Sequence, residues 1–276
     1  MSRYDLHCHS THSDGLLAPA AVVARAIERG VDVLALTDHD EVSGLAEARE
    51  AAAAGGITLV CGSELSVSWG NITIHVVALG IDPQNAALTE GLETIRSGRT
   101  ARARRIADTL ANAGIPGAFE GAMKYVTSER LVSRTHFARF LVEAGYAREV
   151  KDVFNRYLTR GKPGYVAHQW ATLPQAVGWI HAAGGQAVIA HPGRYDVSAT
   201  GMRRLLSEFC DGGGDALEVV SSSHTPAQAV EFATHARVFG LRASCGSDWH
   251  GPEESWIDLG GLPELPAGVV PVWKDW

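Results

Sequence analysis

The sequence lacks several features, and each absence excludes a class of protein. Only four cysteines occur in 276 residues, and no two are spaced as Cys-x-x-Cys, so neither a zinc finger nor a disulfide framework is expected. No apolar run approaches the roughly 20 residues that cross a bilayer, and the first residues lack the apolar core of a secretory signal. We therefore expect a cytoplasmic protein with reduced thiols and no membrane association.

An excess of basic residues is also missing. Lys and Arg total 24 against 31 Asp and Glu, which gives a formal net charge of -7. This balance argues against a protein that coats nucleic acid through a broad basic surface. Histidine, in contrast, occurs 12 times. An acidic, histidine-rich chain raises the question of bound metal before any other.

Short apolar strands alternate with helices in two parts of the chain. The pattern predicts strands at 4–8, 33–37, 57–61 and 72–79, helices at 19–29 and 43–54, and later strands at 186–190, 216–220 and 242–245. Such alternation favours parallel pairing in an α/β architecture. Between about 86 and 157 only helical periodicity is present, including the basic run 96–105, which we interpret as a solvated helix face. We expect an α/β barrel-like domain (1–99 and 166–276) interrupted by a small helical insertion (100–165).

Histidines and carboxylates recur where the predicted strands end. His7 and His9 share one face of the first strand, with Cys8 on the other. Glu64 is expected just beyond the strand at 57–61, whereas His75 lies within the strand at 72–79 and is either a ligand or a core histidine. Active sites of parallel α/β barrels lie at this edge. The nine candidate ligands are His7, His9, Asp14, His39, Glu64, His75, His191, Asp248 and His250.

This set of side chains indicates metal chemistry. Imidazole and carboxylate ligands without thiolate suit zinc, manganese or iron, and nine ligands exceed the needs of one ion, so two or three ions are implied. Clustered divalent ions activate water and neutralise charge on phosphate oxygens, which favours phosphate ester hydrolysis. Asp38 and Asp40 flank His39 and either orient its imidazole or bind an ion themselves.

In combination, these motifs resemble the PHP (polymerase and histidinol phosphatase) family of metallophosphoesterases across nearly the whole chain. The resemblance implies a distorted seven-stranded α/β barrel with a trinuclear metal centre. By motif position it implies that His7, His9, Glu64 and Asp248 hold one ion, that Asp14, His39 and His250 hold a second, and that Glu64, His75 and His191 hold a third, with Glu64 bridging.

Residues 132–142, 157–166 and 190–195 resemble one branch of that family, the bacterial nucleoside 3',5'-bisphosphate phosphatases and the related 5'-to-3' exoribonuclease called ribonuclease AM. This resemblance implies removal of the 3'-phosphate from a nucleotide that also bears a 5'-phosphate, as in the conversion of pAp to AMP. It also implies stepwise release of nucleotides from short 5'-phosphorylated RNA.

A second phosphate needs donors outside the metal cluster. The residues we expect to bind substrate are Arg134, His136, Lys162, Arg194 and His224. Arg134 and Arg194 rank highest, because a guanidinium pairs with phosphate through two parallel hydrogen bonds. The expected nucleophile is a metal-bound hydroxide, and His224 or a water is the candidate donor of a proton to the leaving oxygen.

The expected cofactors are two to three divalent ions, with manganese favoured over iron or zinc. The expected partners are a nucleotide or short RNA, and no stable protein partner is implied. Three alternatives stay open: a phosphomonoesterase of the histidinol-phosphatase type, a metal-dependent amidohydrolase, and a module that binds nucleotide or RNA without hydrolysis. Nine intact ligand positions argue against the last of these.

Overall fold

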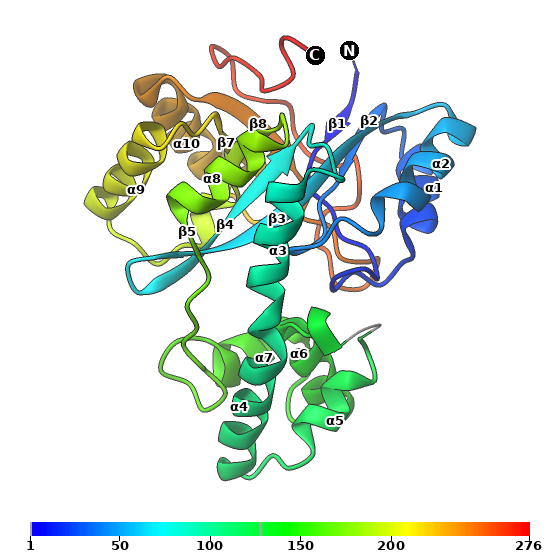
Figure 1. Ribbon diagram of the computed structural model, residues 1–276, viewed down its shortest axis with the longest axis vertical. Helices are drawn as coiled ribbons and strands as arrows, with labels where there is room; N and C mark the ends of the chain where they lie inside the picture. The colour runs from blue at the N-terminus through cyan, green and yellow to red at the C-terminus, as the bar shows by residue number, and fades with distance from the viewer. Residues whose placement is uncertain (1, 127–128) are drawn as a thin grey trace.

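The computed structural model describes residues 2–126 and 129–276 and contains a sheet that curls into a nearly closed barrel (Figure 1). Its strands follow the order β1 (Tyr4–Asp5), β2 (Val33–Leu36), β3 (Thr58–Trp69), β4 (Ile72–Leu79), β6 (Gln186–Ile189), β7 (Ala216–Ser221) and β8 (Arg242–Gly246), and β5 (Ala171–Thr172) pairs with β3. Leu6 N donates to Cys245 O at 3.0 Å, which joins the first and last strands. The distorted seven-stranded α/β barrel is therefore confirmed.

Pairing in the middle of this sheet differs from the all-parallel expectation. β4 is antiparallel to both β3 and β6. The reason is that β3 does not end near Cys61 but continues to Trp69, where Gly70, with φ +55°, and Asn71 turn the chain directly into β4. Two residues cannot hold a crossover helix, so the strands must form a hairpin. Glu64 consequently lies within β3 rather than beyond a strand.

Outer helices cover the barrel, and their apolar faces form the main core against the strands. They are α1 (Pro19–Glu28), α2 (Leu45–Gly55), α3 (Ala86–Ser97), α8 (Leu173–Ala182), α9 (Ala199–Asp211) and α10 (Pro226–Phe239). On α1, for example, Val22, Val23 and Ala26 are buried. Thr172 and Thr225 cap α8 and α10 through capping boxes, which satisfy backbone groups that would otherwise be left without partners.

A second apolar cluster, including Val33, Val60 and Val188, closes the interior at the other end of the barrel from the cap described below. The C-terminal segment seals this end, because Val272 N donates to Ala243 O at 2.9 Å and the Trp273 ring stacks on Tyr4 with centroids 4.1 Å apart. Both chain termini lie here (Figure 1). The opposite end, where the parallel strands finish, holds the large cavity described below, and we call it the open end.

Helices between α3 and β5 form a separate lobe beneath the open end, which we call the cap (Figure 1). Its elements are α4 (Arg99–Asn112), α5 (Ala118–Met123), the 3-10 turn η1 (Glu129–Leu131), α6 (Arg134–Glu143), α7 (Val150–Val153) and the π-helical turn η2 (Phe154–Leu158). It has its own apolar core around Ile106, Leu110, Phe137 and Leu141. Burying a side chain of this size stabilises the fold by roughly 1.5–3 kcal/mol, so the cap does not depend on the barrel core alone.

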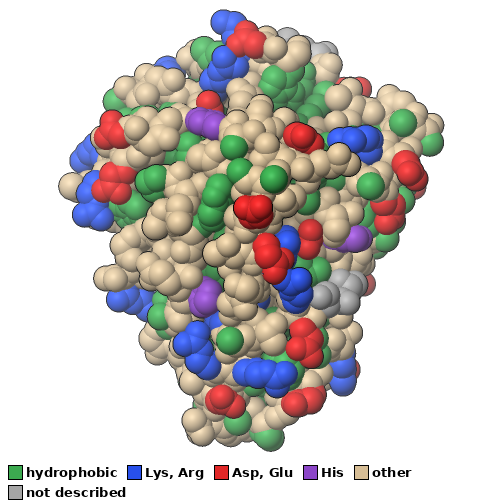
Figure 2. Space-filling model, in the orientation of Figure 1, with side chains coloured by type: hydrophobic (Ala, Val, Ile, Leu, Met, Phe, Trp, Pro, Cys, Tyr) green, Lys and Arg blue, Asp and Glu red, His purple; other side chains and the backbone are tan. Residues whose placement is uncertain are grey.

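Acidic and basic side chains are interspersed over the face of the molecule drawn in Figure 2. No helix within residues 2–126 and 129–276 is long and apolar enough to cross a membrane. All four cysteines are free thiols, and Cys8, Cys61 and Cys245 are buried.

Candidate metal centre

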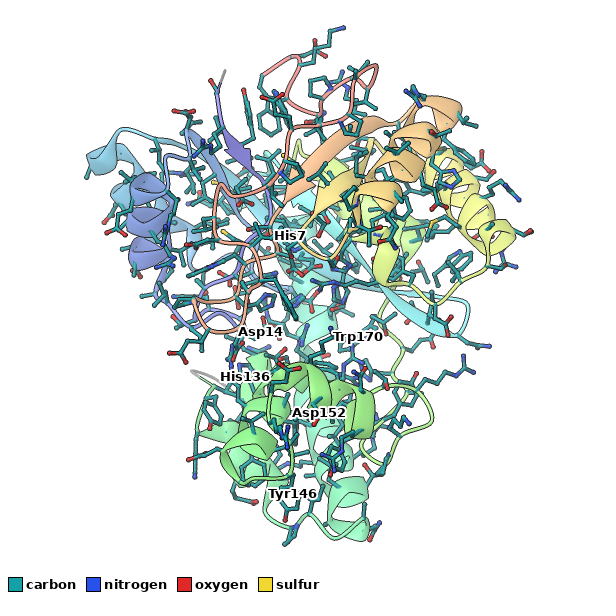
Figure 3. The ribbon with its side chains drawn as sticks, turned by 180° about the vertical axis from the view of Figure 1, so that it is seen from behind. His7, Asp14, His136, Tyr146, Asp152 and Trp170 are labelled. Carbon is teal, nitrogen blue, oxygen red and sulfur yellow. The ribbon has the colours of Figure 1, made fainter. Side chains whose placement is uncertain are left out.

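All nine candidate ligands lie at the open end of the barrel. His7 and His9 follow β1, and Asp14 lies in the next turn, facing the cap (Figure 3). His39 follows β2, and Glu64 and His75 lie on the paired strands β3 and β4. The remaining three, His191, Asp248 and His250, follow β6 and β8. Residues separated by up to 243 positions thus share one site because each lies on or beside a barrel strand at the open end.

Glu64 occupies the centre of this cluster and is fully buried. Its Oε1 lies 2.8 Å from His75 Nδ1 and 2.9 Å from His191 Nε2, and its Oε2 lies 2.9 Å from His39 Nδ1. Although burial disfavours the charged form, the surrounding histidines hold the pKa of Glu64 well below its usual value. An ionised carboxylate with both oxygens among imidazoles is suited to bridge two cations.

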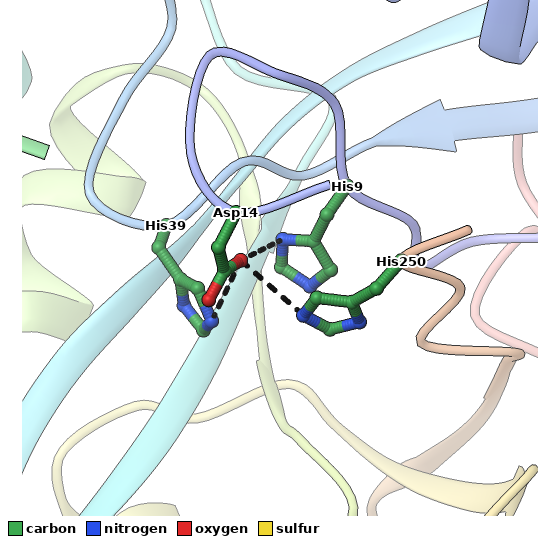
Figure 4. Close-up of side chains that lie close together, drawn as sticks. All are labelled: His9, Asp14, His39 and His250. Atoms are coloured by element: carbon green, nitrogen blue, oxygen red, sulfur yellow. Dashed lines mark ion pairs between the residues drawn. The ribbon is translucent and has the colours of Figure 1, made fainter. Parts of the chain in front are cut away.

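The ligand atoms fall into three overlapping groups, each with its atoms within 4.8 Å of one another. The groups are His7, His9, Glu64 and Asp248; His9, Asp14, His39 and His250; and His39, Glu64 and His75. In the second group, drawn in Figure 4, Asp14 Oδ1 is 3.3 Å from His250 Nε2 and 3.7 Å from His39 Nε2. His191 joins none of the three groups found in the described chain, but it contacts the central Glu64.

Divalent ions fit this site because several of its buried polar atoms form no hydrogen bond within the described residues, although Glu64 Oε2 and His39 Nδ1 lie 2.9 Å apart and Asp248 Oδ2 is in ion-pair contact with Arg194. These atoms are His7 Nε2, Asp14 Oδ1, His39 Nδ1, Glu64 Oε2, His191 Nδ1 and Asp248 Oδ2. Buried polar groups are normally satisfied, and each orphan costs stability. Here the orphans are carboxylate oxygens and imidazole nitrogens from ligand positions on different strands, the donor set that transition metals prefer.

Glu218 supports the cluster, and the sequence reasoning missed it. Its Oε1 lies 2.7 Å from His7 Nδ1, and its Oε2 accepts a hydrogen bond from the His191 backbone at 2.5 Å. A carboxylate on one imidazole nitrogen orients the other nitrogen toward a metal and fixes the tautomer. The sequence signal was an acid in the middle of the apolar strand β7, where an unpaired charge would be costly.

Asp38 and Asp40 order the loops instead of joining the ligands. Asp38 accepts hydrogen bonds from Ser10 N at 2.7 Å and from Ser13 Oγ at 2.6 Å. Asp40 accepts from Ser66 N at 2.6 Å and pairs with the Arg99 guanidinium. Neither aspartate belongs to a ligand group among the described residues.

Strained backbone is concentrated at this end of the barrel. Asp40, His191 and Asp248 have φ values of 52°, 28° and 53°, a region that side-chain-bearing residues avoid at a cost of about 1–3 kcal/mol each. Gly246 is required for another reason: a Cβ there would lie 2.2 Å from His7 Cβ. The fold therefore accepts local strain and tight packing to bring the ligands together.

A cavity of about 880 Å³ lies between the metal-ligand cluster and the cap. Such a volume is near the upper end of the range for small-molecule sites, roughly 300–1,000 Å³. Barrel residues that line it include His39, Glu64 and Arg194, and cap residues include Arg134 and Phe154. The cavity thus joins the two lobes and opens directly onto the ligands.

The basic run 96–105 is not a solvated face, contrary to the sequence interpretation. Arg99 and Arg102 are only 5% and 7% exposed and line the cavity with Arg134. Spacing explains the difference, because residues three apart share one side of a helix while Arg104 and Arg105 point outward. Burial, with Arg134 and Arg99 nearby, lowers the pKa of Arg102 to about 9, so it remains a cation at neutral pH.

These guanidiniums lie against aromatic rings, and one of the three also pairs with a carboxylate. The Arg99 and Arg102 guanidinium carbons lie 5.1 and 5.2 Å from the Trp170 ring centroid, and that of Arg134 lies 5.5 Å from Phe154. Arg99 pairs with Asp40, but Arg102 and Arg134 have no carboxylate partner within the described residues. Clustered, partly desolvated cations of this kind favour an anionic ligand.

Of the five residues expected to bind substrate, the structure places two in the cavity lining and three outside it. Arg134 and Arg194 line the cavity, and Arg194 NH2 lies 2.5 Å from Asp248 Oδ2. His136 is buried in the cap, where its Nδ1 accepts a hydrogen bond from Ser133 N, and Lys162 lies on an exposed turn. His224 lies beside the cavity wall with a backbone partner at each ring nitrogen, Val219 O and Gly193 N.

Fold and site together define a metal-dependent phosphoesterase, and the comparisons agree. Residues 5–159 match the family model described as the PHP domain, and the chain belongs to this family. It is 52% identical to the 3',5'-nucleoside bisphosphate phosphatase of Chromobacterium violaceum over 275 residues, covering 100% of this chain and 96% of the relative. It is 47% identical to the 5'-3' exoribonuclease Rnm of Escherichia coli, covering 99% and 93%.

Two solved structures have the same fold along almost the whole chain. One, from Chromobacterium violaceum, is described as an amidohydrolase with bound sulfate; it has a TM-score of 0.95 and 51% identity and covers 99% of this chain and 95% of that one. The other, described as a metal-dependent phosphoesterase from Bifidobacterium adolescentis, has a TM-score of 0.84 and 26% identity and covers 99% and 94%.

Proposed function

We propose that the protein removes the 3'-phosphate from nucleoside 3',5'-bisphosphates, converting pAp to AMP, and releases nucleotides stepwise from short 5'-phosphorylated RNA. The observation that carries this proposal is the arginine cluster of Arg99, Arg102 and Arg134 across one cavity from the metal-ligand cluster. One phosphate at the ligands and one at the arginines matches a substrate with two phosphates. The names of the relatives at 52% and 47% identity support the same substrate class.

The proposed metal centre uses all nine candidate residues and two to three divalent ions, with manganese favoured over iron or zinc. His7, His9, Glu64 and Asp248 would hold one ion, Asp14, His39 and His250 a second, and Glu64, His75 and His191 a third. Bound there, such ions supply an activated water and neutralise charge on phosphate oxygens. The orphaned buried atoms and the central position of Glu64 support this assignment.

The protein's own side chains are proposed to bind and orient the substrate. Arg194, beside Asp248, would pair with the 3'-phosphate, and Arg134 with its neighbours Arg99 and Arg102 would hold the 5'-phosphate. Residues 100–165 then act as a cap domain that selects for the second phosphate. His136 and His224 are assigned supporting roles, since one caps α6 and the other holds the turn at Gly193.

Aromatic rings at the cavity mouth suit a nucleotide better than a plain phosphate ester. Phe154 of the cap and Trp256 of the barrel both line the cavity, and Trp256 is 80% exposed. Lys151 Nζ lies 4.9 Å from the Trp256 ring, so a cation and an aromatic face lie side by side. Base stacking on such rings contributes about 1–3 kcal/mol per base.

A turnover panel with manganese tests the proposal. We expect release of inorganic phosphate from pAp and slower turnover of 3'-AMP, because 3'-AMP leaves the arginine cluster empty. Comparable turnover of histidinol phosphate, with no loss on replacing Arg134, would favour the histidinol-phosphatase alternative. Hydrolysis of a cyclic amide without phosphate release would favour an amidohydrolase.

A further inference from the structure

Arg139 is a buried cation where three segments meet. It lies on cap helix α6, and its side chain is 7% exposed. Its NH2 group donates to the backbone oxygen of Asp14 at 2.5 Å, and its Nε and NH2 groups donate to the Glu254 carboxylate at 2.6 and 2.8 Å. One guanidinium therefore joins the cap to the Asp14 turn and to the segment after β8.

The Asp14 carboxylate is oriented from the cap side. Ser133, which precedes α6, donates from Oγ to Asp14 Oδ2 at 3.0 Å, while Arg139 holds the Asp14 backbone. These two contacts leave Oδ1 facing His39 and His250 without a hydrogen-bond partner. The cap thus determines which oxygen of Asp14 is presented to the ligand cluster.

The same guanidinium acts on His250 through Glu254. Glu254 N donates to Gly251 O at 3.3 Å, and the adjacent Ser255 accepts at Oγ from His250 N at 2.8 Å. Fixing Glu254 therefore fixes the turn that carries His250. Asp14 and His250 belong to one ligand group, and Arg139 contacts the segments of both.

We propose that Arg139 is a positioning residue that sets the affinity of the ion site formed by Asp14, His39 and His250. This inference rests on the proposed metal centre but not on the identity of the substrate. Partners that orient metal ligands typically change affinity by about 10- to 100-fold when replaced. The effect is selective, because the His7, His9, Glu64 and Asp248 group has Glu218 as its own support on His7.

The test measures manganese binding by calorimetric titration of the full chain, with metal content determined after dialysis. Arg139→Met alone would leave Glu254 charged and unpaired, so the main variant is Arg139→Met with Glu254→Met. We expect one ion to bind about 10- to 100-fold more weakly, with the remaining ions unaffected. Arg139→Lys, which keeps the charge but cannot make all the contacts, should recover part of the affinity.

Arg242→Ala is the control, since Arg242 pairs with Asp275 and donates to Val272 O at the end of the barrel opposite the ligand cluster. Its manganese affinities should equal those of the wild type. Equal affinities in the wild type and the double variant would overturn the role of Arg139 and leave the proposed metal centre intact. Uniform weakening of every ion, with a lower unfolding temperature in chelator, would also overturn it by showing a general structural effect. Failure of the wild type to bind divalent ions would overturn the metal centre itself.

Discussion

At the residue scale, the ligand types and their places in the chain were predictable, but their supporting contacts were not. The strand expected at 4–8 ends at Asp5, so His7 and His9 lie just beyond β1, as His191 and Asp248 lie just beyond buried strands, and this placement at strand ends is what a local pattern can show. Glu218 supports His7 from 211 positions away. Such a contact depends on barrel closure between β1, β7 and β8, which no local pattern contains.

Replacing Glu218 by Gln should weaken metal binding. The amide keeps the shape of the side chain but loses the negative charge that orients His7 and favours its metal-binding tautomer. We expect an affinity loss of about 10- to 100-fold, measured by manganese titration. Glu208→Gln on α9, half exposed and distant from the cluster, should leave the titration unchanged; an unchanged Glu218→Gln titration would contradict the role assigned to Glu218.

Replacing Arg102 by Ala should lower kcat/KM for pAp by about 10- to 100-fold, since a hydrogen bond to a charged group contributes about 1.5–3 kcal/mol. Turnover of 3'-AMP, which has no 5'-phosphate, should change little. Arg104→Ala, an exposed arginine on the same helix, is the control. Equal losses on both substrates in the Arg102 variant would show that the arginine cluster does not recognise the second phosphate.

At the element scale, helices and strands were predicted close to their observed bounds, except in the middle of the sheet. Gly70-Asn71 is a two-residue hairpin signal, but the apolar segments beside it also fit separate strands. The buried side of α4 was missed because a run of arginines suggests solvent, whereas Trp170 and the cavity accommodate Arg99 and Arg102. Charge in a sequence does not reveal which side of a helix another lobe covers.

We expect the stability of the cap to depend on pH through His136, at the N-terminus of α6. This N-terminus has a capping box in which His136 Nδ1 accepts from Ser133 N, and burial lowers the pKa of His136 to about 4. The unfolded chain binds this proton near pH 6.5 while the folded chain does not, so stability falls as the pH decreases from 6.5 toward 4. His136→Gln keeps the box without a titrating group.

Urea unfolding at pH 7 and pH 5.5 measures this difference. Between pH 7 and pH 5.5, the free energy of unfolding of the wild type should fall by about 1 kcal/mol more than that of the His136→Gln variant. Equal losses in the two proteins would mean that His136 is protonated as readily in the folded chain as in the unfolded one.

At the scale of the whole molecule, the site is a joint product of barrel and cap. The barrel supplies the nine candidate ligands, while the cap supplies Arg99, Arg102 and Arg134 and contacts Asp14 through Ser133 and Arg139. The net charge of -7 still argues against broad coating of nucleic acid. It is compatible with a small polyanion in a cavity where arginines and divalent ions concentrate positive charge.

The central claim is that one cavity recognises two phosphates of a nucleotide and hydrolyses one of them. The most direct test compares kcat/KM for pAp and 3'-AMP with the manganese-loaded protein, following phosphate release and identifying the nucleoside product. We predict that pAp is converted to AMP and phosphate with a kcat/KM at least about 10-fold above that of 3'-AMP, from the charge-assisted contacts to its 5'-phosphate. Equal values for the two substrates, or release of the 5'-phosphate from pAp, would contradict the account.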